Sequence, residues 1–274
     1  MEISVIIPTY EFNNYVLECL ESLKKQTLDK EKYEILMIVN GENQEYYQNL
    51  KVLLKKLEIN NIKVFYTEEK GVAKARNIGI FNSKGKYIFF LDDDDYIDTE
   101  LLEKALESLK QENEGYIGVS RYINFFNTKE RKWETRFVKN FRTNNLLFAR
   151  KTFSTIGGKL IPKSIIANEI FDEALENGED SYFMFKISKN IKGIVEIKNV
   201  YYYRRIRENS LNFKIKSKKE ILKIVIKLEK KYINLFFYKK YNKRLLIARV
   251  LAVLKWGGLQ ILMNLKNNKK RRGL

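Results

Sequence analysis

YIFFLDDDD, from Tyr87 to Asp95, places an unbroken apolar run directly before four consecutive aspartates. Such a run is typical of a strand that is buried on both faces of a mostly parallel sheet. Ligands of an open α/β sheet bind beyond the carboxyl ends of its strands, which is where these aspartates stand. The segment therefore predicts both an α/β fold and the location of a site.

The same pattern recurs every 25 to 30 residues toward the N-terminus, in the apolar runs Ile3 to Ile7, Ile35 to Val39 and Ile62 to Tyr66. Helical spacing separates these runs, carried by Val16, Leu20 and Leu23 and then by Leu50, Leu53, Leu54 and Leu57. This alternation predicts a mixed, mostly parallel sheet flanked by helices. No glycine-rich phosphate loop follows the first run, which argues against a dinucleotide-binding or P-loop fold.

Composition narrows the chemistry that this chain can perform. It contains no histidine, so the commonest general base and the commonest transition-metal ligand are both absent. Catalysis must then use carboxylates, lysine, tyrosine or a hard cation. Cys19 is the single cysteine, which excludes an intramolecular disulfide. The first residues lack the basic and apolar segments of a secretory signal, so we expect a cytoplasmic protein.

The four aspartates allow two interpretations. In an extended segment Asp92 and Asp94 share a face and can hold one cation, Mg²⁺ or Mn²⁺, jointly with substrate phosphates, while Asp93 points elsewhere. Alternatively, the run is a solvated turn before a helix from Thr99 to Lys110, with Asp98 as its N-cap. The surrounding motifs favour the first interpretation.

Three motifs in order, Ser4 to Tyr10, Gly71 to Gly79 and Phe90 to Asp95, resemble those of the family 2 glycosyltransferases, which have the so-called GT-A fold. The resemblance covers residues 2 to 211. It implies an inverting, metal-dependent enzyme that uses a nucleoside-diphosphate sugar. It also implies contacts to that donor, from Pro8, Thr9, Tyr10, Glu11, Asn40, Arg76, Asp92, Asp93 and Arg207, and metal ligation by Asp92 and Asp94.

A helix that begins near Val72 would place Arg76 close to its N-terminal end, where backbone N–H groups favour a diphosphate.

A second acidic pair, Glu179 and Asp180, resembles the Glu-Asp motif of the family. The resemblance implies that Asp180 deprotonates the acceptor hydroxyl, with Glu179 beside it. The alternative for this pair is a capped turn that starts a helix from 181 to 188.

Three positions depart from the family pattern. Asn40 replaces a common aspartate, and because an amide both donates and accepts, a UDP-sugar is favoured without excluding thymine or cytosine. Glu11 stands where asparagine is usual. Arg207 occupies the place of a metal-binding histidine, where a guanidinium can instead pair with the diphosphate. A surface arginine is the alternative.

The positive charge lies almost entirely at the C-terminus. Residues 1–213 contain 33 Lys plus Arg against 32 Asp plus Glu, whereas residues 214–274 contain 19 against 2. We therefore divide the chain into a glycosyltransferase domain at 1–213, with a nucleotide-binding part at about 1–98 and an acceptor part at 99–213, and a basic extension. A near-neutral core argues against nucleic-acid binding.

The extension has helical patterns. Ile221, Val225, Leu228, Tyr232 and Leu235 form one stripe, Lys219, Lys223, Lys227 and Lys231 another. The segment from Leu245 to Leu265 is apolar but interrupted by charges, and Lys269 to Arg272 follow it, so we expect it to lie on an anionic membrane with Trp256 inserted. A hairpin packed on the core and a homodimer interface are the alternatives.

The sequence thus predicts a glycosyltransferase of bacterial surface polysaccharide synthesis, peripheral at the inner face of the membrane, with a glycan or lipid-linked acceptor. Two other functions remain open. A sugar-phosphate nucleotidyltransferase shares this type of sheet but needs a glycine-rich loop after the first strand. A non-catalytic protein would use the basic extension to bind membrane or polyanions.

Overall fold

The computed structural model describes residues 1–126, 132–134, 141–207 and 217–272. Their strands are β1 (Ile3–Thr9), β2 (Tyr33–Asn40), β3 (Ile62–Thr67), β4 (Tyr87–Phe90), β5 (Tyr96–Ile97), β6 (Tyr116–Phe126), β7 (Lys132–Glu134), β8 (Arg142–Thr143), β9 (Lys159–Pro162) and β10 (Gly193–Ile206). Their α-helices are α1 (Asn14–Lys24), α2 (Gln44–Lys56), α3 (Val72–Asn82), α4 (Leu101–Lys110), α5 (Lys163–Ile166), α6 (Glu179–Ile187), α7 (Lys218–Phe236) and α8 (Lys243–Arg272). Short 3₁₀ turns are η1 (Lys30–Lys32), η2 (Arg150–Ser154) and η3 (Ser188–Asn190).

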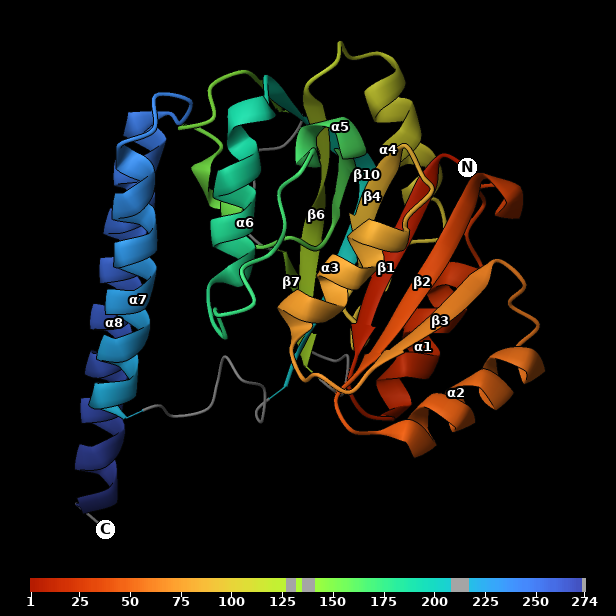
Figure 1. Ribbon diagram of the computed structural model, residues 1–274, viewed down its shortest axis with the longest axis horizontal. Helices are drawn as coiled ribbons and strands as arrows, with labels where there is room; N and C mark the ends of the chain where they lie inside the picture. Colours follow the sequence, from red (N-terminus) through yellow and green to blue (C-terminus); the bar gives the residue numbers. More distant parts are fainter. Residues whose placement is uncertain (127–131, 135–140, 208–216, 273–274) are drawn as a thin grey trace.

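The strands form one mixed sheet in the order β3-β2-β1-β4-β9-β6-β10-β5, with β7 on β6 and β8 on β10 (Figure 1). β3, β2, β1 and β4 run parallel. β9 runs antiparallel to both β4 and β6, and β6 pairs in parallel with β10. The predicted fold class, a mixed and mostly parallel sheet flanked by helices, is confirmed.

Both faces of the sheet are covered, because side chains alternate along each buried strand. Ile3, Val5 and Ile7 of β1 pack in one apolar cluster with residues of α1, α2 and α4. Ile6 points to the opposite face and packs in a second cluster with residues of α3, α5 and α6. This two-sided burial explains why these strands read as continuous apolar runs rather than alternating ones.

The four predicted strands and the helix from Val72 are all present. Two local predictions are wrong. Residues 92–95 are not extended but form a turn, in which the Asp95 N–H bonds the Asp92 carbonyl at 3.1 Å. Asp98 does not cap α4, because that helix begins at Leu101 and the Asp98 carboxylate instead accepts the Tyr201 N–H at 2.7 Å.

The C-terminal residues form a helical hairpin of α7 and α8 beside α6 (Figure 1). A Ser217–Glu220 capping box begins α7. The predicted stripe of α7 faces inward, since Leu228 and Tyr232 are buried in a third apolar cluster with Tyr182 and Phe185 of α6. The backbone from Lys269 to Arg272 forms the end of α8, but the structure does not describe these basic side chains.

Candidate active site

The side chains that follow β1, β2 and β4 meet at the carboxyl edge of the sheet. Thr9 Oγ1, at the end of β1, donates to Asp93 Oδ2 at 2.6 Å and lies 2.8 Å from the Tyr46 hydroxyl. Asn40, at the end of β2, donates to the Thr9 carbonyl at 2.8 Å and accepts the Gly71 N–H at 2.9 Å. Asn40 therefore ties the end of β1 to the start of α3.

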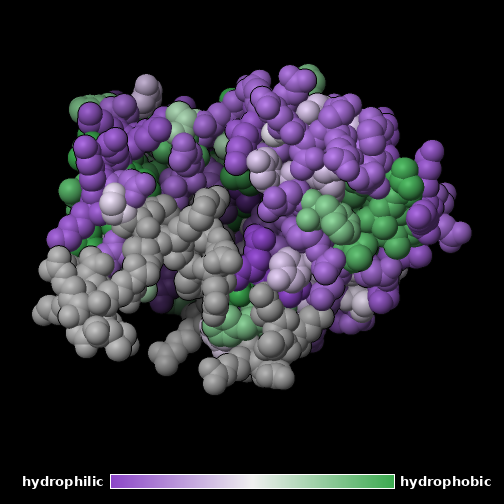
Figure 2. Space-filling model, turned by 90° about the horizontal axis from the view of Figure 1, so that it is seen from below, coloured by the Kyte–Doolittle hydropathy of each residue, from purple (hydrophilic) through white to green (hydrophobic). Residues whose placement is uncertain are grey.

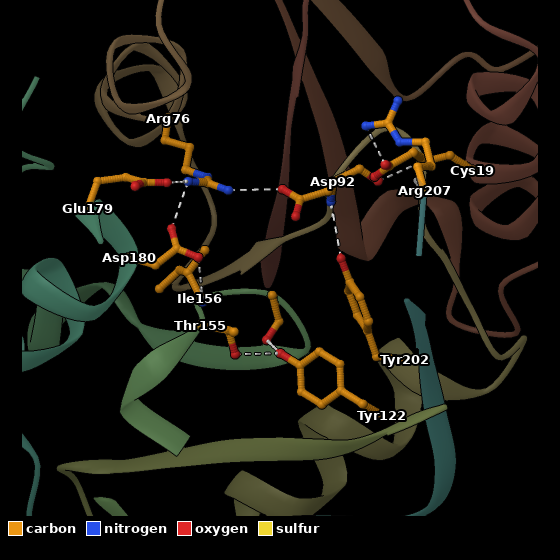
Figure 3. A network of polar contacts seen from close by, with 12 residues as sticks. Cys19, Arg76, Asp92, Tyr122, Thr155, Ile156, Glu179, Asp180, Tyr202 and Arg207 are labelled. Atoms are coloured by element: carbon orange, nitrogen blue, oxygen red, sulfur yellow. Dashed lines mark hydrogen bonds and ion pairs between the residues drawn. The ribbon is translucent and has the colours of Figure 1, made fainter. Parts of the chain in front are cut away.

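Arg76 is the centre of the site (Figure 3). One guanidinium nitrogen donates to Asp92 Oδ1 at 2.9 Å, and the other donates to Asp180 Oδ1 at 2.7 Å and lies 3.4 Å from Glu179 Oε1. The arginine side chain is only 4% exposed. A single buried cation thus joins the acidic run after β4 to the acidic pair that begins α6.

Two glycines let α3 bring Arg76 to this position. Gly71, the N-cap, has a φ of +152°, in the region that favours glycine. Gly79 lies against β1 so closely that a Cβ there would stand 2.4 Å from Ile6 Cγ2. Any larger residue would push α3, and with it Arg76, away from the sheet.

Burial and mutual repulsion set the charges of the acidic pair. Burial raises the pKa of Asp180, although Arg76 opposes the shift. Burial and the neighbouring Asp180 charge raise the pKa of Glu179 to about 7. Burial disfavours the charge on Arg76, but the three carboxylates outweigh it and raise the arginine pKa. Asp180 is held further by the Ile156 N–H, at 3.1 Å from Oδ2.

Asp94 and Asp95 face the end of β10. Arg207 pairs with Asp94 Oδ2 at 2.6 Å. The Arg205 guanidinium donates from Nε to the Asp94 carbonyl at 2.9 Å and from a terminal nitrogen to the Glu18 carboxylate at 2.8 Å. The backbone N–H of Arg205 donates to the Asp95 carboxylate at 2.7 Å. Arg205 therefore fixes the turn that presents Asp94.

The turn has a surplus of negative charge. Burial first, and then the Asp94 charge, raise the pKa of Asp93 to about 7, while burial and Asp92 raise that of Asp94 to about 6. A cation beside these oxygens would relieve the repulsion. No cluster of three or more acidic, histidine or cysteine side chains that could hold a metal occurs among residues 1–126, 132–134, 141–207 and 217–272. Oxygen ligands from the protein alone would not complete a cation's shell there.

The residues predicted in the first loop differ in their exposure. Pro8 is buried within β1, whereas Tyr10 is exposed and carries Lys70 4.3 Å above its ring. Glu11 is exposed, and the structure does not bring it together with the acidic run. Figure 2 shows hydrophilic residues in the middle of this side of the molecule.

Lys159 and Tyr202 belong to the site but carry no local sequence signal. The Asp92 N–H donates to the Tyr202 hydroxyl at 3.2 Å. Lys159, fully buried at the start of β9, donates to the Gly157 carbonyl at 3.2 Å and lies 3.4 Å from Thr155 Oγ1. Burial lowers its pKa to about 7, although Asp180 opposes the shift. Only its unusual burial identifies this lysine.

We expect Lys159→Met to change how stability depends on pH. Between pH 7 and 10 the unfolded chain keeps the lysine proton that the folded chain has lost, so this group makes the wild type more stable as pH rises, by about 1.4 kcal/mol per pH unit. The free energy of unfolding of the variant minus that of the wild type should therefore fall over this range in urea titrations. A constant difference would contradict the buried, neutral lysine.

Comparison with known proteins places these features in context. The sequence pattern described as glycosyl transferase family 2 matches residues 4–171. Poly(ribitol-phosphate) beta-N-acetylglucosaminyltransferase TarS of Staphylococcus aureus is 26% identical over 212 residues, which are 76% of this chain and 36% of that protein. Minor teichoic acid biosynthesis protein GgaA of Bacillus subtilis is 30% identical over 215 residues, 75% of this chain and 47% of that protein. This chain thus spans about a third to a half of these relatives.

Solved structures share the fold. The crystal structure of S. aureus TarS 1-349 in complex with UDP-GlcNAc matches with a TM-score of 0.71 and 24% identity, covering 85% of this chain and 67% of that one. The mannosyltransferase PcManGT from Pyrobaculum calidifontis, in complex with GDP-Man and Mn²⁺, matches with a TM-score of 0.65 and 14% identity, over 98% and 75% of the two chains.

Proposed function

This chain belongs to glycosyl transferase family 2, and we propose that it is an inverting enzyme that transfers a sugar from a nucleoside-diphosphate sugar to a glycan or lipid-linked hydroxyl in bacterial surface polysaccharide synthesis. The observation that carries the proposal is the position of Arg76 between Asp92 and Asp180. It places a donor-side carboxylate and a candidate base on either side of one buried cation, at the edge of the sheet where ligands bind.

In this proposal Asp180 is the general base. As the bond between the sugar anomeric carbon and the donor diphosphate breaks, the acceptor oxygen bonds the opposite face of that carbon and its proton passes to Asp180. A raised pKa makes the carboxylate a better proton acceptor, and burial supplies that shift. Glu179 beside it would hold a proton near neutral pH and so limit the repulsion around Asp180.

A UDP-sugar is the favoured donor, supported by the TarS structures in complex with UDP and UDP-GlcNAc. Tyr10 offers an exposed ring to the nucleoside beside Pro8 and Thr9, with Glu11 at the rim. Asn40 and Asp93 hold the loops around the nucleoside, through the contacts of both with Thr9. The residues at the end of β1 and directly after it would thus form the nucleoside-binding part of the site.

Carboxylate oxygens like those of the turn are ligands that Mg²⁺ and Mn²⁺ prefer. Asp92 and Asp94 would hold the cation together with the donor diphosphate, and the bound cation would neutralise charge on the departing nucleoside diphosphate. Burial, and then the Asp92 charge that such a cation would relieve, raise the pKa of Asp94. Arg207, now paired with Asp94, would turn its guanidinium to the diphosphate.

Residues 1–213 would form the catalytic domain, divided near residue 98 into nucleotide-binding and acceptor parts. The extension from 214 would bring the domain to the cytoplasmic face of an anionic membrane, where a lipid-linked acceptor is found. Homodimerisation through the extension is the alternative arrangement.

We expect UDP with Mn²⁺ to raise the melting temperature of the wild type, and Asp94→Asn to remove most of that rise. At a ligand concentration of about 100 Kd, binding adds about 2.7 kcal/mol to stability. Differential scanning fluorimetry with UDP, GDP, CDP and dTDP, each with Mn²⁺, Mg²⁺ or EDTA, measures it. Asp29→Asn, in an exposed turn, is the matched control. Failure of every nucleotide would sink the enzyme proposal.

A further inference from the structure

The α7–α8 hairpin carries an exposed apolar surface, here called the outer face. It includes Leu222, Ile226 and Ile233 of α7 and Leu251, Leu254 and Leu262 of α8, each of which is more than half exposed. Figure 2 shows hydrophobic side chains along the outer edge of the hairpin, beside hydrophilic ones. An apolar surface of this length on a water-soluble domain marks an interaction site.

The outer face is distinct from the face that packs on the domain. The stripe predicted from sequence, which includes Leu228 and Tyr232, is buried against α6. In α8 two polar side chains, Arg249 and Asn264, are buried, at 7% and 8% exposure, whereas Lys255 and the leucines between them are exposed. Trp256 is only half-buried and does not belong to the outer face as defined here. Because α8 also buries Leu245, Leu246 and Val253 in the third cluster, it is apolar on both its inner and its outer side.

Lysines border the outer face along α7. Lys219, Lys223 and Lys230 are exposed and lie at helical spacing beside Leu222 and Ile226. Anionic lipid headgroups complement this combination, because the lysines meet phosphates while the apolar side chains enter the boundary of the acyl chains. A second copy of the chain would present the same lysines, which would repel.

We infer that the outer face lies flat on an anionic membrane leaflet, with α7 and α8 parallel to its plane. Among the described residues, one stretch, Lys243–Asn264, is long and apolar enough to cross a membrane. It packs along α7, and α7 packs on α6, so a crossing would draw the lysines of α7 into the acyl region at high cost. The inference rests on the proposed function for its purpose, since a lipid-linked acceptor resides at that surface.

Co-sedimentation of the full chain with phosphatidylcholine vesicles, with or without phosphatidylglycerol, tests the charge. The wild type should bind the anionic vesicles. Lys219→Gln/Lys223→Gln/Lys230→Gln should bind them roughly 100-fold more weakly, because each lysine near the surface contributes about fivefold. Equal binding of both proteins, or equal binding to both kinds of vesicle, would overturn the inference.

A second variant tests the apolar contact. Leu251→Gln/Leu254→Gln should lower vesicle binding by about tenfold or more. Val52→Gln, an exposed apolar residue on α2, should leave it unchanged. If light scattering without lipid instead shows a wild-type dimer that the leucine variant separates, a second copy covers the face and the inference fails.

The reaction gives an independent readout. Both hairpin variants should hydrolyse a UDP-sugar in solution as the wild type does, because the outer face lies apart from the acidic run. Vesicle binding without any donor binding would refute the proposed function alone. Donor turnover with no preference for anionic vesicles would refute only the docking.

Discussion

Replacement of Asp180 by asparagine is expected to lower sugar transfer by about 10²- to 10⁴-fold, the usual contribution of a general base. The amide oxygen can still accept from Arg76, which now bonds Oδ1 at 2.7 Å, whereas the amide NH2 cannot accept from the Ile156 N–H, which now bonds Oδ2 at 3.1 Å. The site should therefore keep its contact with Arg76 while losing its proton acceptor and one backbone hydrogen bond. Initial rates with a UDP-sugar and an acceptor glycan, beside the UDP-induced melting shift, separate catalysis from binding.

The pH profile gives the same prediction a second measurement. Transfer needs the ionised carboxylate, and burial raises the pKa of Asp180, so the wild-type rate should fall with decreasing pH through a pKa above the ordinary aspartate range. Glu176→Gln, an exposed carboxylate before α6, should retain both rate and profile. An Asp180→Asn enzyme that keeps a tenth of the wild-type rate would show that the base lies elsewhere.

Arg76→Met should cost about 3–5 kcal/mol of unfolding free energy, the effect of removing one partner from a buried ion pair. The change leaves Asp92, Glu179 and Asp180 without the cation that all three face. Urea unfolding at pH 7.5 measures the loss. The deficit should shrink as the pH falls, because protonation neutralises the abandoned carboxylates.

An exposed arginine provides the matched control. Arg142 bonds both carboxylate oxygens of Glu112 but is 55% exposed, so Arg142→Ala should cost less than about 1 kcal/mol. Arg76→Lys should fall between the two, since one ammonium group cannot spread over three carboxylates as a guanidinium does. Similar losses for Arg76→Met and Arg142→Ala would contradict a central role for Arg76.

Local patterns predicted the sheet because burial on both faces leaves an unmistakable apolar run. The position of β4 and the start of α3 at Val72 follow directly from such patterns, although β4 ends at Phe90, one residue before the apolar run ends. The same reasoning misjudged the conformation after β4. It assumed that the chain stays extended through Asp94, whereas a hydrogen-bonded turn begins as soon as the strand ends.

The candidate residues of the site were predicted from family resemblance, but their contacts were not. Arg76 and Asp180 are 104 positions apart in the chain, and no periodicity links such distant residues. Lys159 and Arg205 were missed, because a lysine in an apolar strand and an arginine in a basic one have no pattern of their own. Their importance comes from burial, which depends on what packs around them.

The acidic run thus illustrates the division between sequence and tertiary structure. By itself the sequence determined that four aspartates follow a buried strand at the ligand-binding edge, because strand length and sheet polarity are encoded locally. Only the tertiary structure decided that Asp92 faces Arg76, Asp93 faces Thr9 and Asp94 faces Arg207. Those directions depend on a turn and on three separate elements that surround it, and such packing is a property of the whole folded chain.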